Sequence, residues 1–194
     1  EGEPVVIYDS IAAGPSVRDS CITQHHEFDG FNNDCFQALA TVLSDMGLAN
    51  SSVGFESNII GFRDWTELAR RLPKLEMKDC TSTLDQTRWI KTQAEVDLIR
   101  AGALLLDECY LEVLAETRAG DTERDVHARM IAGCIQRGAG WAHGILNSSQ
   151  NNVIYCGESG ATFSSGDVIR TDYVAYVDGY PGHQNRNAVI GKPS

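Results

Sequence analysis

The pattern of apolar and polar positions predicts two long helices in the middle of the chain. After Thr92, apolar residues recur at helical spacing, at Ile99, Ala103, Leu106, Tyr110 and Leu114. Thr92 and Glu95 have the spacing of a capping box, which favours a helix start at this point. A second helical pattern contains Val126, Met130, Ile131 and Cys134. We therefore expect helices over residues 92–118 and 122–137.

The last part of the chain predicts a β-hairpin. β-branched and aromatic residues dominate positions 168–176, and a second strand-like run covers 183–190. Asp178-Gly179 lies between them and favours a tight turn, because glycine accepts the positive φ that a primed turn needs. Residues 140–154 are also strand-like. We expect an antiparallel sheet packed against the two helices.

The first eighty residues alternate between strand-like and helical patterns. The strand-like runs are residues 4–8, 53–56 and 76–80, and the helical runs are 34–46 and 64–72. This alternation predicts an α/β layer. Residues 10–30 contain Gly14-Pro15 and Asp29-Gly30 and are expected to be irregular. Residues 83–89 are expected to connect this part to the long helices.

Composition and net charge limit the kinds of molecule that this protein is expected to bind. The chain has 194 residues, of which 42% are hydrophobic and 22% charged, as in ordinary globular proteins. Its formal net charge of −11 argues against nucleic acids and anionic membranes, since phosphate binding relies on clustered Lys and Arg. No apolar run approaches the length of a membrane-spanning helix. The six cysteines match no zinc module, which fits a reducing cytoplasm.

Asp172 is the acidic residue of the first hairpin strand. If it is buried, its carboxylate must be hydrogen-bonded, paired or bound to a metal; the commoner case is an Asp on the solvent face. His183 follows eleven residues later on the second strand. Hairpin pairing would bring the two side chains onto one face. Asp and His together are suitable ligands for Zn, Mn, Co or Fe(II).

Several short motifs resemble the pita-bread hydrolases, a family that includes methionine aminopeptidase, aminopeptidase P, prolidase and creatinase. The central hairpin motif is carried by Gly166, Asp167, Asp172, Gly179, Tyr180, Arg186, Gly191 and Pro193. The resemblance implies an α+β fold, with the first half of a pita-bread catalytic domain over residues 85–194. Residues 1–84 would be the C-terminal part of a creatinase-type α/β amino-terminal domain. We expect both ends to be cut from a longer polypeptide.

The resemblance also implies roles for individual residues. Asp172 stands where the metallopeptidases have their first metal ligand, and His183 stands where they have a second Asp. The position of the family's substrate-positioning His is occupied by Tyr155 or Cys156. Tyr155 could donate a hydrogen bond to an oxyanion, and Cys156 could act as a nucleophile. The alternative is that both are packing residues only. His143 and Arg186 are candidate substrate-binding residues. The family's other ligands, a His and two Glu, lie in the second half of the domain.

Three functions follow from this resemblance. The first is a metal-dependent hydrolase of the Xaa-Pro aminopeptidase or prolidase type, in which Mn, Zn, Co or Fe activates water. The alternatives are a creatinase-like C–N hydrolase without metal, and a non-catalytic peptide-binding domain. We favour the first, acting as a cytoplasmic homodimer on a small peptide or amide substrate.

Overall fold

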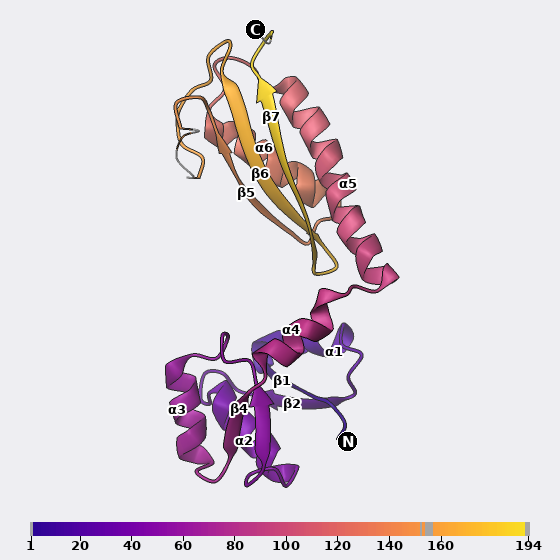
Figure 1. Ribbon diagram of the computed structural model, residues 1–194, viewed down its shortest axis with the longest axis vertical. Helices are drawn as coiled ribbons and strands as arrows, with labels where there is room; N and C mark the ends of the chain where they lie inside the picture. Colours follow the sequence, from indigo (N-terminus) through magenta and orange to yellow (C-terminus); the bar gives the residue numbers. More distant parts are fainter. Residues whose placement is uncertain (1, 152, 154–156, 193–194) are drawn as a thin grey trace. The chain divides into compact units, whose positions relative to one another are not determined.

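A computed structural model of the protein describes residues 2–151, 153 and 157–192. The chain forms two compact units, Glu1–Ile90 and Lys91–Ser194, which are called here the first and the second unit (Figure 1). Each unit has its own buried apolar core, so each is described by itself.

The first unit combines short parallel strand pairs with helices. Its elements are β1 (Val5–Asp9), η1 (Ser10–Ala12), α1 (Ala13–Arg18), β2 (Gln24–Phe28), α2 (Cys35–Asp45), β3 (Ser52–Phe55), α3 (Phe62–Arg71), β4 (Glu76–Asp79) and α4 (Thr81–Trp89). β1 pairs with β2, and β3 pairs with β4, both in parallel. Parallel pairing needs a crossover connection between the strands, as the predicted α/β alternation implies. Its buried core residues are Ala40, Leu68, Leu72 and Leu75.

Two local predictions for this unit were wrong, and a third segment is more regular than the sequence indicated. Residues 10–30 are not irregular, since they form η1, α1 and β2. Pro15 lies in the first turn of α1, where its missing N–H removes no helical hydrogen bond. The helix α3 begins at Phe62 rather than Asp64, with Gly61 at its N-cap and no side-chain cap. The expected connection at 83–89 is part of the helix α4.

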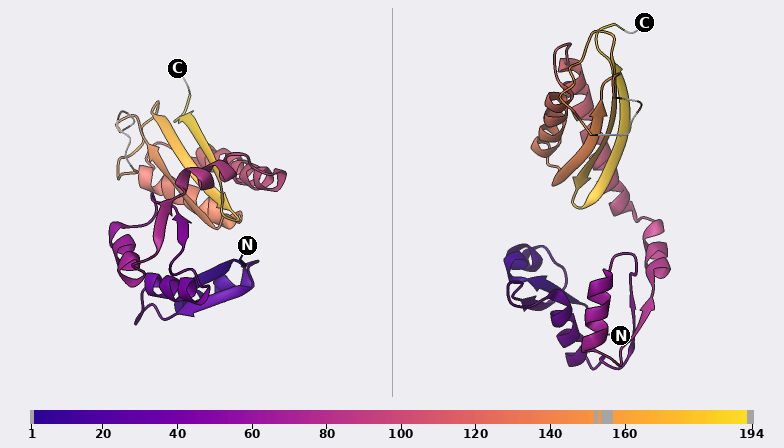
Figure 2. Two further views of the ribbon diagram at one scale, coloured as in Figure 1. Left: turned by 60° about the horizontal axis from the view of Figure 1, so that its bottom comes forward. Right: turned by 90° about the vertical axis from the view of Figure 1, so that its left-hand side faces the viewer.

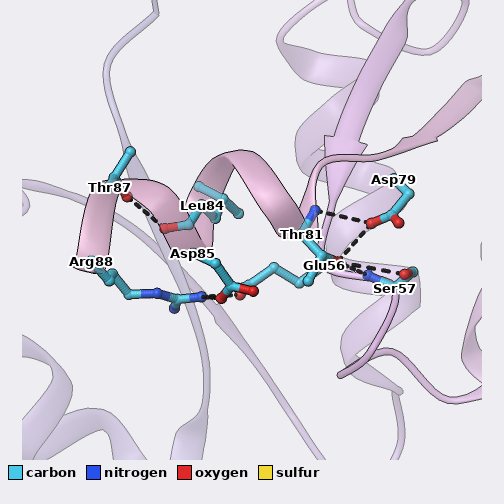
Figure 3. Close-up of polar contacts among 8 residues, drawn as sticks. All are labelled: Glu56, Ser57, Asp79, Thr81, Leu84, Asp85, Thr87 and Arg88. Carbon is cyan, nitrogen blue, oxygen red and sulfur yellow. Dashed lines mark hydrogen bonds and ion pairs between the residues drawn. The ribbon is translucent and has the colours of Figure 1, made fainter.

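The helix α4 is tied to the first unit by polar contacts at both ends (Figure 3). At its start, Asp79 Oδ1 accepts hydrogen bonds from the backbone N–H and the hydroxyl of Thr81, at 2.9 and 2.6 Å. At its end, Arg88 donates to Glu56 at 2.5 Å and to Asp85 at 3.1 Å. The predicted domain boundary between residues 84 and 85 therefore lies inside this helix.

The second unit contains the two long helices and the antiparallel sheet that the sequence predicts. Its elements are α5 (Gln93–Glu116), α6 (Glu123–Gln136), β5 (Trp141–Asn147), β6 (Val168–Val177) and β7 (Tyr180–Val189). The strand order is β5-β6-β7, and both pairings are antiparallel. Asp178 and Gly179 form the turn with φ of +46° and +82°. The predicted capping box of Thr92 and Glu95 is present, and Tyr180 donates to Glu95 at 2.9 Å.

The core of the second unit lies between the helices and one face of the sheet (Figure 2). Strand residues alternate between the two faces, so that every second residue of β6 points toward the helices. These residues are buried: Ile169, Thr171, Tyr173 and Ala175. On the helices, Leu106, Val126, Met130 and Cys134 are fully buried.

Leu106 and Ile131 differ in burial, and this predicts different effects of truncation. Leu106 is fully buried, so Leu106→Ala should lower the free energy of unfolding by about 3 kcal/mol through lost apolar contacts and a new cavity. Ile131 is only partly buried at the edge of the same core, so Ile131→Ala should cost less. Urea unfolding of the two variants checks this ranking. Equal effects would mean that the core is centred elsewhere.

Candidate active site

The candidate site lies on the face of the sheet that points away from α5 and α6, called here the open face (Figure 2). Within the described part of the second unit, no helix or strand covers this face. Three cross-strand rows lie side by side on it. They are Trp141, Tyr176 and Pro181; His143, Val174 and His183; and Ile145, Asp172 and Asn185.

The hairpin brings Asp172 and His183 together on the open face. They lie in neighbouring rows, diagonal to one another rather than directly opposite. His183 Nε2 lies 2.5 Å from Asp172 Oδ1, which is a hydrogen bond. The Asp172 side chain is 18% exposed and the His183 side chain 55%, so the pair is half-open to solvent. A carboxylate oxygen and an imidazole nitrogen thus lie next to each other on this face.

His143 lies on the same face, and Val174 stands between it and His183. Two strand spacings separate these imidazoles' backbones by about 10 Å. The ring of His143 contacts that of Trp141, with the centroids 4.7 Å apart. His143 therefore lies on the same face as the Asp172–His183 pair but is separated from His183 by the strand β6.

Arg186 does not join these residues. It pairs with Thr171, whose side chain points into the core, so Arg186 belongs to the helix-covered face. Its guanidinium donates to Asp107 of α5 at 2.9 Å and lies over the ring of Tyr110. Positions 183 and 186 differ by an odd number, and the two-residue period of a strand places them on opposite faces. Tyr155 and Cys156 lie outside the described residues.

The donor set on the open face fits part of a divalent metal site. Asp172 supplies an oxygen ligand and His183 a nitrogen ligand, and the two atoms lie within hydrogen-bond distance of one another. Among the residues that the structure describes, no three His, Cys, Asp or Glu side chains lie close enough together to hold a metal ion. Two ligands bind a metal weakly, so a complete site needs ligands in addition to those described.

Sequence reasoning missed the buried carboxylate of Glu123, the first residue of α6. It is fully buried and accepts hydrogen bonds from Ser148 N at 2.6 Å, Ser159 N at 2.8 Å and Ser159 Oγ at 2.7 Å. Asn151 Nδ2 adds a donor at 3.0 Å. Burial alone would raise the pKa of Glu123, but these donors hold it below its ordinary value. In the sequence Glu123 stands in Gly120-Asp121-Thr122-Glu123, between the two long helices, and nothing local there indicates that its carboxylate is buried.

His127 of α6 has a structural partner behind the strand that carries Asp172. Its Nδ1 lies 2.8 Å from the hydroxyl of Tyr173, which is fully buried. Burial raises the pKa of Tyr173, so the phenol keeps its proton and the two side chains are joined by a neutral hydroxyl. This bond holds Tyr173 in place beneath the open face.

The comparison with known sequences identifies the family. A sequence model of metallopeptidase family M24 matches residues 97–194. The chain belongs to this family. The M24 match covers α5 from residue 97 onward, all of α6 and the whole hairpin, including Asp172 and His183.

Individual relatives of the M24 chain are distant in sequence and close in fold. An uncharacterised peptidase, YqhT of Bacillus subtilis, is 22% identical over 165 residues, which is 81% of this chain and 45% of the relative. The X-Pro aminopeptidase of Thermotoga maritima matches 99% of this chain with a TM-score of 0.87 at 19% identity, and 52% of its own length is covered. The prolidase of Pyrococcus furiosus matches 99% with a TM-score of 0.81 at 19% identity, and 54% is covered.

These likenesses confirm the predicted fold class. The M24 chain has the first half of the pita-bread fold, preceded by part of an α/β amino-terminal domain. It spans about half the length of the relatives and structures that it matches. Within the part of the chain that the structure describes, no helix is long and apolar enough to span a membrane.

Proposed function

We propose that this M24 chain forms half of a metal-dependent peptidase that cleaves Xaa-Pro peptide bonds. The observation that carries the proposal is the contact of Asp172 and His183 at 2.5 Å on the open face. Their spacing of eleven residues is that of the family's first two metal ligands. The likeness to proteins named X-Pro aminopeptidase and prolidase supports the choice of substrate.

Asp172 and His183 would hold the divalent metal, which would activate water and polarise the peptide carbonyl. Replacing a carboxylate by the neutral imidazole of His183 removes one negative charge from the ligand set. We therefore expect weaker binding of divalent cations than at a pair of carboxylates. The other ligands would come from the second half of the catalytic domain, which the relatives have and this chain does not span. His143 would contact the substrate from the neighbouring row.

Adding a carboxylate to the site should raise its metal affinity, and removing one should lower it. His183→Asp should tighten Mn²⁺ binding by about tenfold or more, because it restores a second carboxylate. Asp172→Asn should remove most of the binding. The control is Asp97→Asn, at an exposed ion pair of α5, which should leave affinity unchanged. Calorimetric titration with Mn²⁺ and hydrolysis of Xaa-Pro dipeptides test this in a polypeptide that spans the relatives' full length.

A metal-independent hydrolase is the second candidate, and one observation favours it. Asp172 and His183 satisfy each other by a direct hydrogen bond, as in an acid–base pair that needs no cation. Hydrolysis that survives both a chelator and Asp172→Asn would favour this candidate and contradict the metal-dependent one. The homodimer and the cytoplasmic location stay predictions.

A further inference from the structure

Three rings form an aromatic cluster on the open face. Trp141 and Tyr176 pair across strands β5 and β6, and their rings stack with centroids 4.9 Å apart and 30° between the planes. His143 adds a third ring, 4.7 Å from Trp141 and 6.1 Å from Tyr176. Trp141 remains 56% exposed, so one broad π surface stays available to solvent. The cluster contains no charged carboxylate or guanidinium group.

This cluster differs from a single exposed apolar residue. Scattered exposed hydrophobic residues are ordinary on a protein surface, whereas a contiguous patch beside polar groups marks a binding site. Here the patch is continuous with the candidate site. His143 and His183 flank Val174 in one row, and Asp172 follows in the next row. A ligand that extends from the Asp172–His183 pair toward the turn of the hairpin therefore lies over or next to the rings.

The spacing along the strand defines what such a ligand must be. Strand residues advance by about 3.3 Å, so Tyr176 lies about 13 Å from Asp172, and the row of His143 lies about half as far. An extended peptide advances by a similar amount for each residue. A peptide whose scissile bond lies at Asp172 would place on the rings a residue two to four positions away.

We propose that the aromatic cluster of Trp141, Tyr176 and His143 is a subsite for a proline ring two to four residues from the bond cleaved. The position of the bond rests on the proposed function, but binding to the cluster does not. Proline-rich segments are preformed extended chains that dock on aromatic surfaces, since the pyrrolidine ring packs flat against the π face. The subsite gives the enzyme a preference for oligopeptides over dipeptides.

The binding step can be tested without catalysis. The chain has three tryptophans, so Trp65→Phe together with Trp89→Phe leaves Trp141 as the reporter. Titration with tetraproline should change its fluorescence saturably, with an affinity about fivefold higher than for tetra-alanine. Tyr176→Ala should remove about the same factor. Phe62→Ala, at an exposed aromatic residue of the first unit, should change nothing.

Two outcomes would overturn the inference. One is the absence of a saturable signal, or equal affinity for the two peptides, in a variant whose circular dichroism matches that of the parent. The other is seen in the active full-length enzyme, when Trp141→Ala lowers kcat/KM equally for an Xaa-Pro dipeptide and a pentapeptide. We expect the loss to be about fivefold larger for the pentapeptide. Failure to find any metal-dependent hydrolysis would contradict the proposed function and leave the binding test valid.

Discussion

Glu123→Ala should destabilise the second unit by about 4–5 kcal/mol. The carboxylate is fully buried, and it accepts five hydrogen bonds from four donor groups of Ser148, Asn151 and Ser159. Its removal leaves these donors without their acceptor, and each buried unpaired polar group costs roughly 1–3 kcal/mol. The position of Glu123 at the first turn of α6 adds a favourable interaction of the carboxylate with the helix dipole, which alanine also loses.

A more conservative variant separates charge from volume. Glu123→Gln keeps one acceptor oxygen but turns an amide N–H toward donors, so we expect a loss of about 2 kcal/mol. Glu116→Gln, at an exposed position on α5, is the matched control and should stay within about 0.5 kcal/mol. Urea unfolding, followed by the fluorescence of Trp141 in a background with Trp65→Phe and Trp89→Phe, measures all three variants. A loss below about 1 kcal/mol for Glu123→Ala would mean that water replaces the carboxylate.

The same carboxylate predicts a pH dependence of stability. The folded state lowers the pKa of Glu123 below its ordinary value of 4.5. Its contribution to stability is therefore complete above that ordinary value and is lost as the pH falls through the folded value. The difference between the parent and Glu123→Gln should be largest near pH 7 and should shrink below about pH 4. A difference that does not change with pH would show that the charge of Glu123 contributes nothing.

The sequence predicted the second unit well because its signals are local. Capping residues, helical periodicity and the Asp178-Gly179 turn each act within a few residues, and they fixed the element types. The hairpin turn also determined the register, and therefore the shared face of Asp172 and His183. The first unit was harder. The strand β2 is short and polar, and only its pairing with β1 makes it a strand.

The site could be predicted only where strand alternation was applied to every residue. Position 186 differs in parity from position 183, so counting along the strand would have placed Arg186 on the helix-covered face. The hairpin motif suggested that Arg186 binds substrate, because a family pattern does not show which face of the sheet a side chain points to. Glu123 and its partners could not be found in this way, since Ser148, Asn151 and Ser159 are 25 to 36 residues distant in sequence.

Gly182→Ala should destabilise the second unit by more than the roughly 1–3 kcal/mol that is typical of overpacking, to an extent similar to that of Glu123→Ala. A Cβ on Gly182 would lie 2.3 Å from both Gly102 C and Ala103 N in α5. The obstacle is backbone rather than a flexible side chain, so α5 and β7 would have to separate. Gly102 is equally constrained, because its own Cβ would lie 2.8 Å from Gly182 N. The two glycines let a helix and a strand pack backbone to backbone.

Gly140→Ala is the matched control, since a Cβ there meets nothing within 4 Å and its φ is not positive. It should be neutral or slightly stabilising. His183 directly follows Gly182, so displacement of β7 should also move the imidazole away from Asp172. We therefore expect Gly182→Ala to weaken Mn²⁺ binding in the full-length protein under conditions where the variant remains folded. If stability and metal affinity were both unchanged, α5 and β7 would be far enough apart to accommodate the added methyl group, contrary to the distance of 2.3 Å between the added Cβ and α5.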